Sequence, residues 1–156
     1  MCSSDLRQDP EGPYAAVIPR WVRAMLLGEA VEMYGDGETT RDFCYIANAV
    51  QANLLAALTD DAQALNRVYN VAVGERTSLN QLFEILRSLL GAERPTVRAA
   101  RPVHRPLREG DVRHSLADIS LARRMLGYEP SHTISSGLGE ALSWYVDRFA
   151  GTATVA

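Results

Sequence analysis

The stretch VYNVAVGERTSLNQL constrains the fold of this chain more than any other. Its first six residues, 68–73, form an apolar run of strand length that is rich in β-branched side chains. Ser78 and Gln81 then match the Ser-x-x-Gln pattern of a capping box, and apolar residues at helical spacing follow as far as Gly91, where we expect the helix to end. A helix expected at 48–59 precedes the run. The order helix, strand, helix predicts an α/β fold in which helices cover a parallel sheet.

Local signals predict the remaining elements in the same way. Pro19 in a first turn and Gly28 as a stop bound the first helix, whose apolar face we expect to pack into the core. The helix that precedes the strand carries Val50, Leu54 and Leu58 at helical spacing and is expected to be buried. The first helix is expected at 17–28. The other expected elements are a strand at 31–34, a turn at 35–37, extended backbone at 42–46 and 96–99, and helices at 118–125 and 134–149.

The composition excludes several classes of partner and chemistry. A net charge of −3 gives no broad electropositive surface, so nucleic acid is not expected as a partner. No apolar run approaches the ~20 residues of a membrane span, and a cytoplasmic protein with free thiols at Cys2 and Cys44 is expected. All 16 basic residues are arginine, so lysine-dependent chemistry, including a Tyr-x-x-x-Lys dyad, is excluded within these residues.

The segment GDGETTRDFCYI, residues 35–46, carries the first candidate site. Gly35 and Gly37 open a possible G-x-G-x-x-G, but position 40 is Thr and extended backbone is expected next, so a tight turn is the better interpretation. Arg41 is placed between this turn and an apolar strand, from which its guanidinium could bind a phosphate or carboxylate with two hydrogen bonds. The alternative is an ordinary solvated or ion-paired arginine.

A second candidate site lies in the segment 94–113, which contains three prolines and six arginines and predicts a long extended connection. Arg108 and Asp111 flank a flexible Gly110, so the pair could bind a phosphate and a sugar hydroxyl, or simply form a local ion pair. The three histidines show no metal-ligand spacing, and Thr39 and Thr40 are expected to be turn residues.

Four motifs in this order resemble a known family. RQDPEGPYAAVIPRW, GDGETTRDFCYI, VYNVAVGERTSLNQL and REGDVRHSLAD are similar to the C-terminal half of the extended short-chain dehydrogenase/reductases, in the NAD-dependent epimerase/dehydratase family. Within it, the resemblance is to the bacterial UDP-N-acetylglucosamine 4-epimerases of surface polysaccharide biosynthesis. It implies the C-terminal part of a Rossmann-like doubly wound fold, with the small mixed α/β lobe that binds the substrate. The N-terminal half, which binds NAD, would be missing.

The resemblance also implies a role for individual residues. It assigns no catalytic, cofactor-binding or metal-binding residue to this chain. Glu32 and Tyr34 depart from the family, which has an aromatic residue and an asparagine at these positions. The implied substrate contacts are Arg41 and Arg108 on the diphosphate, Asp111 on the ribose, Ala16, Val17 and Trp21 around the uracil, Gln8 near the ribose or uracil, and Ser115 beside the N-acetyl group.

In the family mechanism, a tyrosine base and NAD oxidise C4 of the sugar, and the hydride then returns to the other face of the rotated 4-keto sugar. The dinucleotide motif and the Tyr-x-x-x-Lys of this mechanism belong upstream of Arg7. We therefore expect the chain to bind the UDP-sugar but not to catalyse epimerisation alone. The parent enzyme is expected to be a homodimer through helices missing here.

The expected boundaries are 1–6 as non-native, adaptor-derived residues, 7–150 as the nucleotide-sugar-binding part, and 151–156 as a disordered tail. Two alternatives stay open. The parent could be another UDP- or dTDP-sugar epimerase, decarboxylase or dehydratase, or the chain could be a non-catalytic nucleotide-sugar-binding module.

Overall fold

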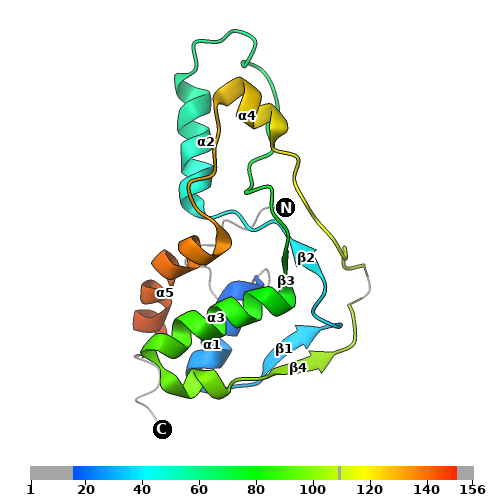
Figure 1. Cartoon of the computed structure of the whole chain (residues 1–156), viewed down its shortest axis with the longest axis vertical. Helices are drawn as coiled ribbons and strands as arrows, with labels where there is room; N and C mark the ends of the chain where they lie inside the picture. The colour runs from blue at the N-terminus through cyan, green and yellow to red at the C-terminus, as the bar shows by residue number, and fades with distance from the viewer. Residues whose placement is uncertain (1–15, 109, 151–156) are drawn as a thin grey trace.

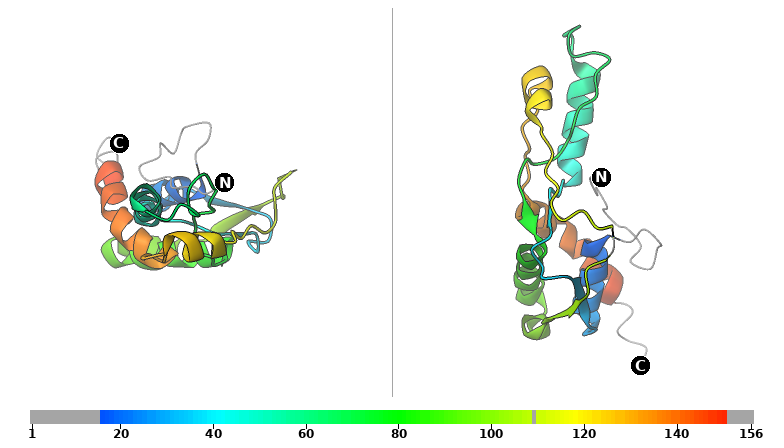
Figure 2. Two further views of the ribbon diagram at one scale, coloured as in Figure 1. Left: turned by 90° about the horizontal axis from the view of Figure 1, so that it is seen from above. Right: turned by 90° about the vertical axis from the view of Figure 1, so that its right-hand side faces the viewer.

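The computed structural model describes residues 16–108 and 110–150. The molecule is elongated, with α2 and α4 at one end, α1, α3, α5, β1 and β4 at the other, and β2 and β3 between them (Figures 1 and 2). None of the described helices is long and apolar enough to span a membrane. The elements are α1 (Val17–Leu27), β1 (Val31–Tyr34), β2 (Thr40–Arg41), α2 (Ile46–Leu58), β3 (Thr77–Ser78), α3 (Leu79–Glu93), the 3-10 helix η1 (Pro95–Ala99), β4 (Pro102–Arg105), α4 (Ser120–Leu126) and α5 (Ile134–Ala150).

Two small sheets confirm the α/β prediction. β1 and β4 are parallel, with Val31 opposite Pro102 and Tyr34 opposite Arg105. β2 and β3 are antiparallel, and Thr40 of β2 also forms a parallel bridge with His114. The second sheet therefore brings the end of the long connection between β4 and α4 against the residue that precedes Arg41.

The strand expected at 68–73 does not form, and this prediction was wrong. These residues have no regular structure, and Val68 is 90% exposed. A strand requires a neighbouring strand for its backbone hydrogen bonds, and within the described residues none pairs with this run. Instead, the amides of Val73 and Gly74 donate to the carboxylate of Asp42.

The strand expected at 96–99 does not form, and this prediction was also wrong. Residues 95–99 form the 3-10 helix η1, and strand β4 begins at Pro102. Pro95 starts η1 at a position where its missing N–H is not needed. Val97 of η1 is buried in the main core, which holds the turn against α3. The burial of Val97 therefore outweighs the strand propensity of this segment.

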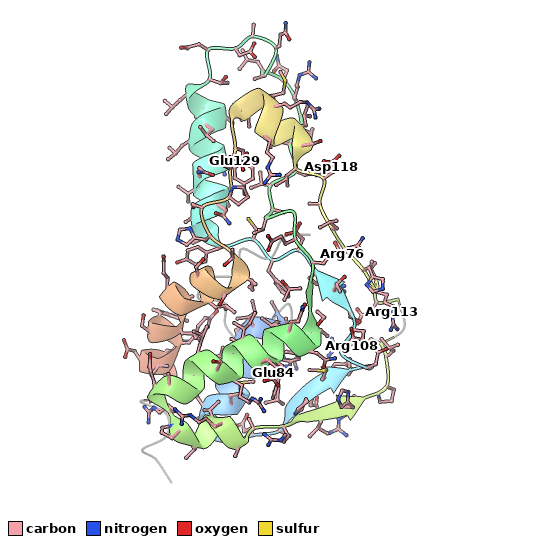
Figure 3. All side chains as sticks on the ribbon, viewed as in Figure 1. Arg76, Glu84, Arg108, Arg113, Asp118 and Glu129 are labelled. Carbon is pink, nitrogen blue, oxygen red and sulfur yellow. The ribbon has the colours of Figure 1, made fainter. Side chains whose placement is uncertain are left out.

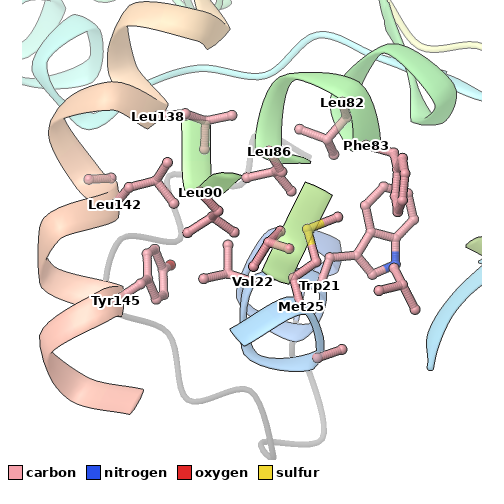
Figure 4. Close-up of a cluster of buried hydrophobic side chains, with 14 of the residues drawn as sticks. Trp21, Val22, Met25, Leu82, Phe83, Leu86, Leu90, Leu138, Leu142 and Tyr145 are labelled. Atoms are coloured by element: carbon pink, nitrogen blue, oxygen red, sulfur yellow. The ribbon is translucent and has the colours of Figure 1, made fainter. Parts of the chain in front are cut away.

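The main core lies between α1, α3 and α5, and the faces expected for these helices are confirmed (Figure 4). Trp21 of α1 meets Phe83 of α3 edge to face, with ring centroids 6.0 Å apart. The other members that Figure 4 labels are Val22, Met25, Leu82, Leu86, Leu90, Leu138, Leu142 and Tyr145, and all of them are buried.

The expected helix ends are confirmed in part. The capping box of α3 forms, and Gly28 ends α1 in a left-handed conformation with φ 70°. Gly91 does not end α3, which continues to Glu93. A Cβ at position 91 would lie 2.8 Å from Cγ of Arg98, so the glycine is explained by the close packing of η1 on the helix. Two further bounds differ by a few residues, because Ile46 already belongs to α2 and α4 starts at Ser120.

The burial expected for α2 is wrong. Val50, Leu54 and Leu58 are 50%, 56% and 77% exposed, and the buried residues of this helix are Asn48 and Ala52. Ala52 belongs to a second, smaller core that joins α2 to α4. Its buried members are Ala52, Ala72, Ile119, Ala122 and Tyr128.

Candidate functional site

A cavity of about 650 Å³ collects seven of the eight residues for which a substrate contact was expected. Gln8, the eighth, and the expected end segments 1–6 and 151–156 lie outside the described residues. The described residues that line the cavity are Ala16, Val17, Trp21, Glu32, Tyr34, Thr39, Arg41, Asp42, Phe43, Tyr69, Asn70, Val71, Leu79, Arg108, Asp111, Ser115, Leu116 and Ala117.

Arg41 ends β2 and is half-buried in the cavity wall. Its Nη1 donates to the carbonyl oxygens of Thr40 and Val112, at 2.8 and 2.6 Å. Both bonds come from Nη1, so the other edge of the guanidinium, formed by Nε and Nη2, takes no part in them. The side chain is held in place by backbone, which leaves a planar pair of donors suited to an anion with two oxygens.

Arg108 reaches the cavity from the loop after β4 (Figure 3). Its guanidinium carbon lies 3.8 Å from the centroid of the Tyr34 ring, so cation and ring are stacked. The ion pairs nearest this loop in the described part of the chain join Arg105 to Glu32 and Arg113 to Asp36, and neither of them involves Arg108. The amide of Asp111 donates to the carbonyl of Arg108 at 3.3 Å, so the two residues are held in one turn.

The rim formed by α1 is apolar. Ala16 occupies the N-cap position of this helix, Val17 is its first residue, and Trp21 lies one turn further on. Trp21 is 4% exposed, and its Nε1 donates to the carbonyl of Glu32 at 2.9 Å, which fixes the ring beside β1. A fixed ring at the cavity wall suits a flat apolar group such as a base.

Asp42 is a lining residue that was not expected from the sequence. Its Oδ1 accepts from the amide of Val73 at 3.1 Å, and its Oδ2 accepts from the amides of Gly74 and Ala117 at 3.0 and 3.3 Å. The carboxylate thereby joins the backbone at residues 73 and 74 to the backbone at residue 117. The sequence signal that could have identified Asp42 is its position directly after Arg41.

Two of the acids that line the cavity, Glu32 and Asp42, are held by partners within the protein. Arg105 Nε donates to Oε1 of Glu32 at 3.0 Å, and Arg105 Nη2 forms an ion pair with the same oxygen at 2.9 Å. This bond, assisted by the hydroxyl of Tyr34, lowers the pKa of Glu32 below its ordinary value against the opposing effect of desolvation. The carboxylate of Asp42 is held by hydrogen bonds from three backbone amides.

Ser115 lies beside β2, because its amide donates to the carbonyl of Thr40 at 3.2 Å. It is half-buried and lines the cavity with Leu116 and Ala117. A hydroxymethyl side chain at this point leaves more space in the cavity than a larger residue would.

The histidines make contacts within the protein. His104 Nδ1 lies 2.7 Å from the carbonyl of Gly35, His114 Nδ1 lies 3.1 Å from Thr40 Oγ1, and His132 Nε2 lies 2.8 Å from Glu140 Oε1. Over residues 16–108 and 110–150, no group of three metal-binding side chains comes together.

The chain is similar in sequence and fold to known proteins. The model of the NAD dependent epimerase/dehydratase family matches residues 5–72. A UDP-glucose 4-epimerase from Thermotoga maritima, solved with UDP-glucose, is 38% identical and superimposes with a TM-score of 0.79 over 92% of this chain and 43% of its own. A UDP-N-acetylglucosamine 4-epimerase from Methanobrevibacter ruminantium, solved with UDP-N-acetylmuramic acid, gives the same identity, TM-score and coverage.

The relatives differ in the reactions for which they are named. A UDP-N-acetyl-alpha-D-glucosaminuronate decarboxylase from Bacillus cytotoxicus is 28% identical over 86% of this chain and 41% of its own length. The chain thus shares the α/β fold of solved Rossmann-like epimerases and spans about two fifths of the length of these relatives.

Proposed function

We propose that the chain belongs to the NAD dependent epimerase/dehydratase family and supplies the substrate-binding part of a UDP-N-acetylglucosamine/UDP-N-acetylgalactosamine 4-epimerase. The observation that carries the proposal is the meeting of Arg41 and Arg108 at one cavity that also holds the fixed ring of Trp21. Two guanidinium groups and a flat apolar wall are the groups that a nucleoside diphosphate requires. The similarity to 4-epimerases solved with UDP-sugars supports this choice of ligand.

In this proposal, each residue has a binding role. Arg41 and Arg108 hold the diphosphate, Asp111 binds the ribose hydroxyls, and Trp21 with Ala16 and Val17 surrounds the uracil. Gln8 is proposed to approach the ribose or uracil, and Ser115 to leave room for an N-acetyl group. Anchoring the UDP allows the hexose to rotate between oxidation and reduction of C4, so the two arginines would affect both kcat and KM of the whole enzyme.

NAD accepts and returns the hydride in enzymes of this family. The described residues do not fit a dinucleotide pyrophosphate, because Gly35 and Gly37 form a turn that leads to β2 and not to a helix N-terminus. The chain also lacks lysine and so a Tyr-x-x-x-Lys. We therefore place NAD binding and the chemical step in the part of the family fold that this chain does not span.

The first test measures binding of labelled UDP by equilibrium dialysis. Wild-type chain should bind UDP, and Arg41→Ala and Arg108→Ala should each weaken binding about 10- to 100-fold, since a hydrogen bond to a charged group contributes ~1.5–3 kcal/mol. Arg124→Ala, on the exposed surface of α4, is the matched control and should bind as wild type. Absence of UDP binding by the wild-type chain contradicts the proposal, as does turnover of UDP-N-acetylglucosamine by the chain with added NAD.

The same assay separates the proposed substrate from its alternatives. UDP-N-acetylglucosamine should compete with labelled UDP at least as well as UDP-glucose does. Ser115→Leu should weaken the N-acetyl sugar selectively, because the larger side chain fills the space assigned to the acetamido group. Equal weakening of UDP-glucose and UDP-N-acetylglucosamine would favour another member of the family, such as the decarboxylase class found among the relatives.

A further inference from the structure

Arg108 has little local support for its position. It lies in the loop that follows β4, close to Gly110, which adopts φ 84°. Its side chain is exposed. A long arginine on such a loop would lose much rotamer freedom on binding an anion, and this loss opposes binding.

Tyr34 supplies the missing support. Its ring lies 3.8 Å from the guanidinium carbon of Arg108, which is close contact between the two flat groups. Tyr34 belongs to β1, which is paired along its length with β4. The ring is therefore carried by a sheet, whereas the cation is carried by a loop.

The Tyr34 ring is itself held by charged neighbours. Its hydroxyl donates to Oε2 of Glu32 at 3.3 Å, and Oε1 of Glu32 accepts from Arg105 of β4. The pKa of Glu32 is lowered chiefly by the bond from Arg105, so Glu32 is a carboxylate at neutral pH. A phenol that donates to an anion gains electron density in its ring, and this strengthens the attraction of the ring for a cation.

The stack also sets the direction of the arginine. Because one face of the guanidinium is covered by Tyr34, an anion must approach the N–H groups in the guanidinium plane. Both side chains line the same cavity. We infer that Tyr34 is a positioning residue that pre-orders Arg108 for the diphosphate of the ligand. This inference rests on the proposed function and adds to it the device that orients one phosphate-binding group.

Binding of labelled UDP and labelled uridine tests this role by equilibrium dialysis. Tyr34→Leu should weaken UDP about three- to tenfold and leave uridine unchanged, because uridine has no phosphate for Arg108 to bind. Tyr34→Phe keeps the ring and should bind UDP within about twofold of wild type. In an Arg108→Ala background, Tyr34→Leu should cause no further loss, since the ring acts through the arginine.

Each other outcome has a defined meaning. If wild type binds UDP but Tyr34→Leu binds it equally well, the inference is wrong and the proposed function stands. Equal weakening of uridine and UDP, or additive losses in the double variant, also overturns the inference, because the ring would then act on the base or on the fold. If wild type does not bind UDP, the proposed function fails and the inference fails with it.

A second measurement does not depend on any ligand or on the stability of Tyr34→Leu. The Arg108 Nε–H proton, assigned by NMR through its loss in Arg108→Ala, should shift upfield under the ring current in wild type and Tyr34→Phe. Tyr34→Met, an unbranched replacement without a ring, should move it to the range of exposed arginines. The same position of this signal in all three proteins would overturn the stack.

Discussion

Two buried polar side chains show how single residues organise this molecule. Asp42 joins residues 73, 74 and 117 through their amides. Asn48 does the same for the connection between α4 and α5, since its Oδ1 accepts from the amides of Ser131 and His132 and its Nδ2 donates to the carbonyl of His132. Both satisfy backbone groups of segments without regular structure, where no ladder is present to do so.

Asp42→Asn tests this role. An amide in place of the carboxylate loses the charge and turns one acceptor into a donor that faces backbone N–H groups, so we expect the free energy of unfolding to fall by about 1–3 kcal/mol. Urea unfolding followed by circular dichroism measures the change. Asp147→Asn, on the exposed surface of α5, is the matched control and should stay within about 0.5 kcal/mol of wild type. Equal midpoints for both variants would show that Asp42 does not hold the wall.

Among the elements, α3 has a start that is specified by its own sequence. Ser78 Oγ accepts from the amide of Gln81 at 3.1 Å, and Gln81 Oε1 accepts from the amide of Ser78 at 2.8 Å. Both bonds are local and need no distant residue. Ser78 also belongs to β3, whose partner β2 leads into the cavity wall, so the cap connects the helix with the site.

Ser78→Ala should therefore cost about 1 kcal/mol of stability, within a range of about 0.5–2 kcal/mol for the loss of an N-cap. Thermal unfolding of the two proteins measures this change. Ser88→Ala lies on the exposed face of the same helix and should be neutral or slightly stabilising, because alanine is the better helix former. A destabilisation of the same size at both positions would mean that the cap contributes nothing specific.

At the scale of the whole molecule, the exposed apolar side of α2 stands out. Val50, Leu54 and Leu58 follow one another at intervals of four residues and are all at least half exposed, and Leu65 and Val68 in the segment after α2 are also exposed. Contiguous apolar surface of this kind favours association between molecules. The site itself lies away from α2, since no residue of this helix lines the cavity.

We expect the isolated chain to self-associate as its concentration rises. Leu54→Gln combined with Leu58→Gln should reduce this association, because two exposed leucines are replaced by polar residues of helix-forming type. Light scattering over a concentration series measures the effect, and UDP binding by the double variant should equal that of wild type. A wild-type chain that stays monomeric at high concentration and unfolds in one cooperative transition would contradict this prediction.

Much of the molecule was predictable because its signals are local. The start of α3, the left-handed stop at Gly28 and the turn at Gly35 and Gly37 follow from residues next to one another. The apolar faces of α1, α3 and α5 follow from their spacing. The clustering of the expected site residues around one cavity agrees with the resemblance, although their contacts with a ligand stay a prediction.

Tertiary contacts decided the rest. The run at 68–73 has the composition of a strand, but hydrogen bonds to Asp42 replace a ladder. Residues 95–99 form a 3-10 helix in which Val97 is buried in the main core. The stack of Arg108 on Tyr34 joins residues 74 positions apart, and no local pattern specifies such a pair. Sequence by itself determined where α1 and α3 begin and which faces of α1, α3 and α5 are apolar, because these depend on neighbours along the chain. Only the tertiary structure decided which segments pair and which charges meet, because these depend on neighbours in space.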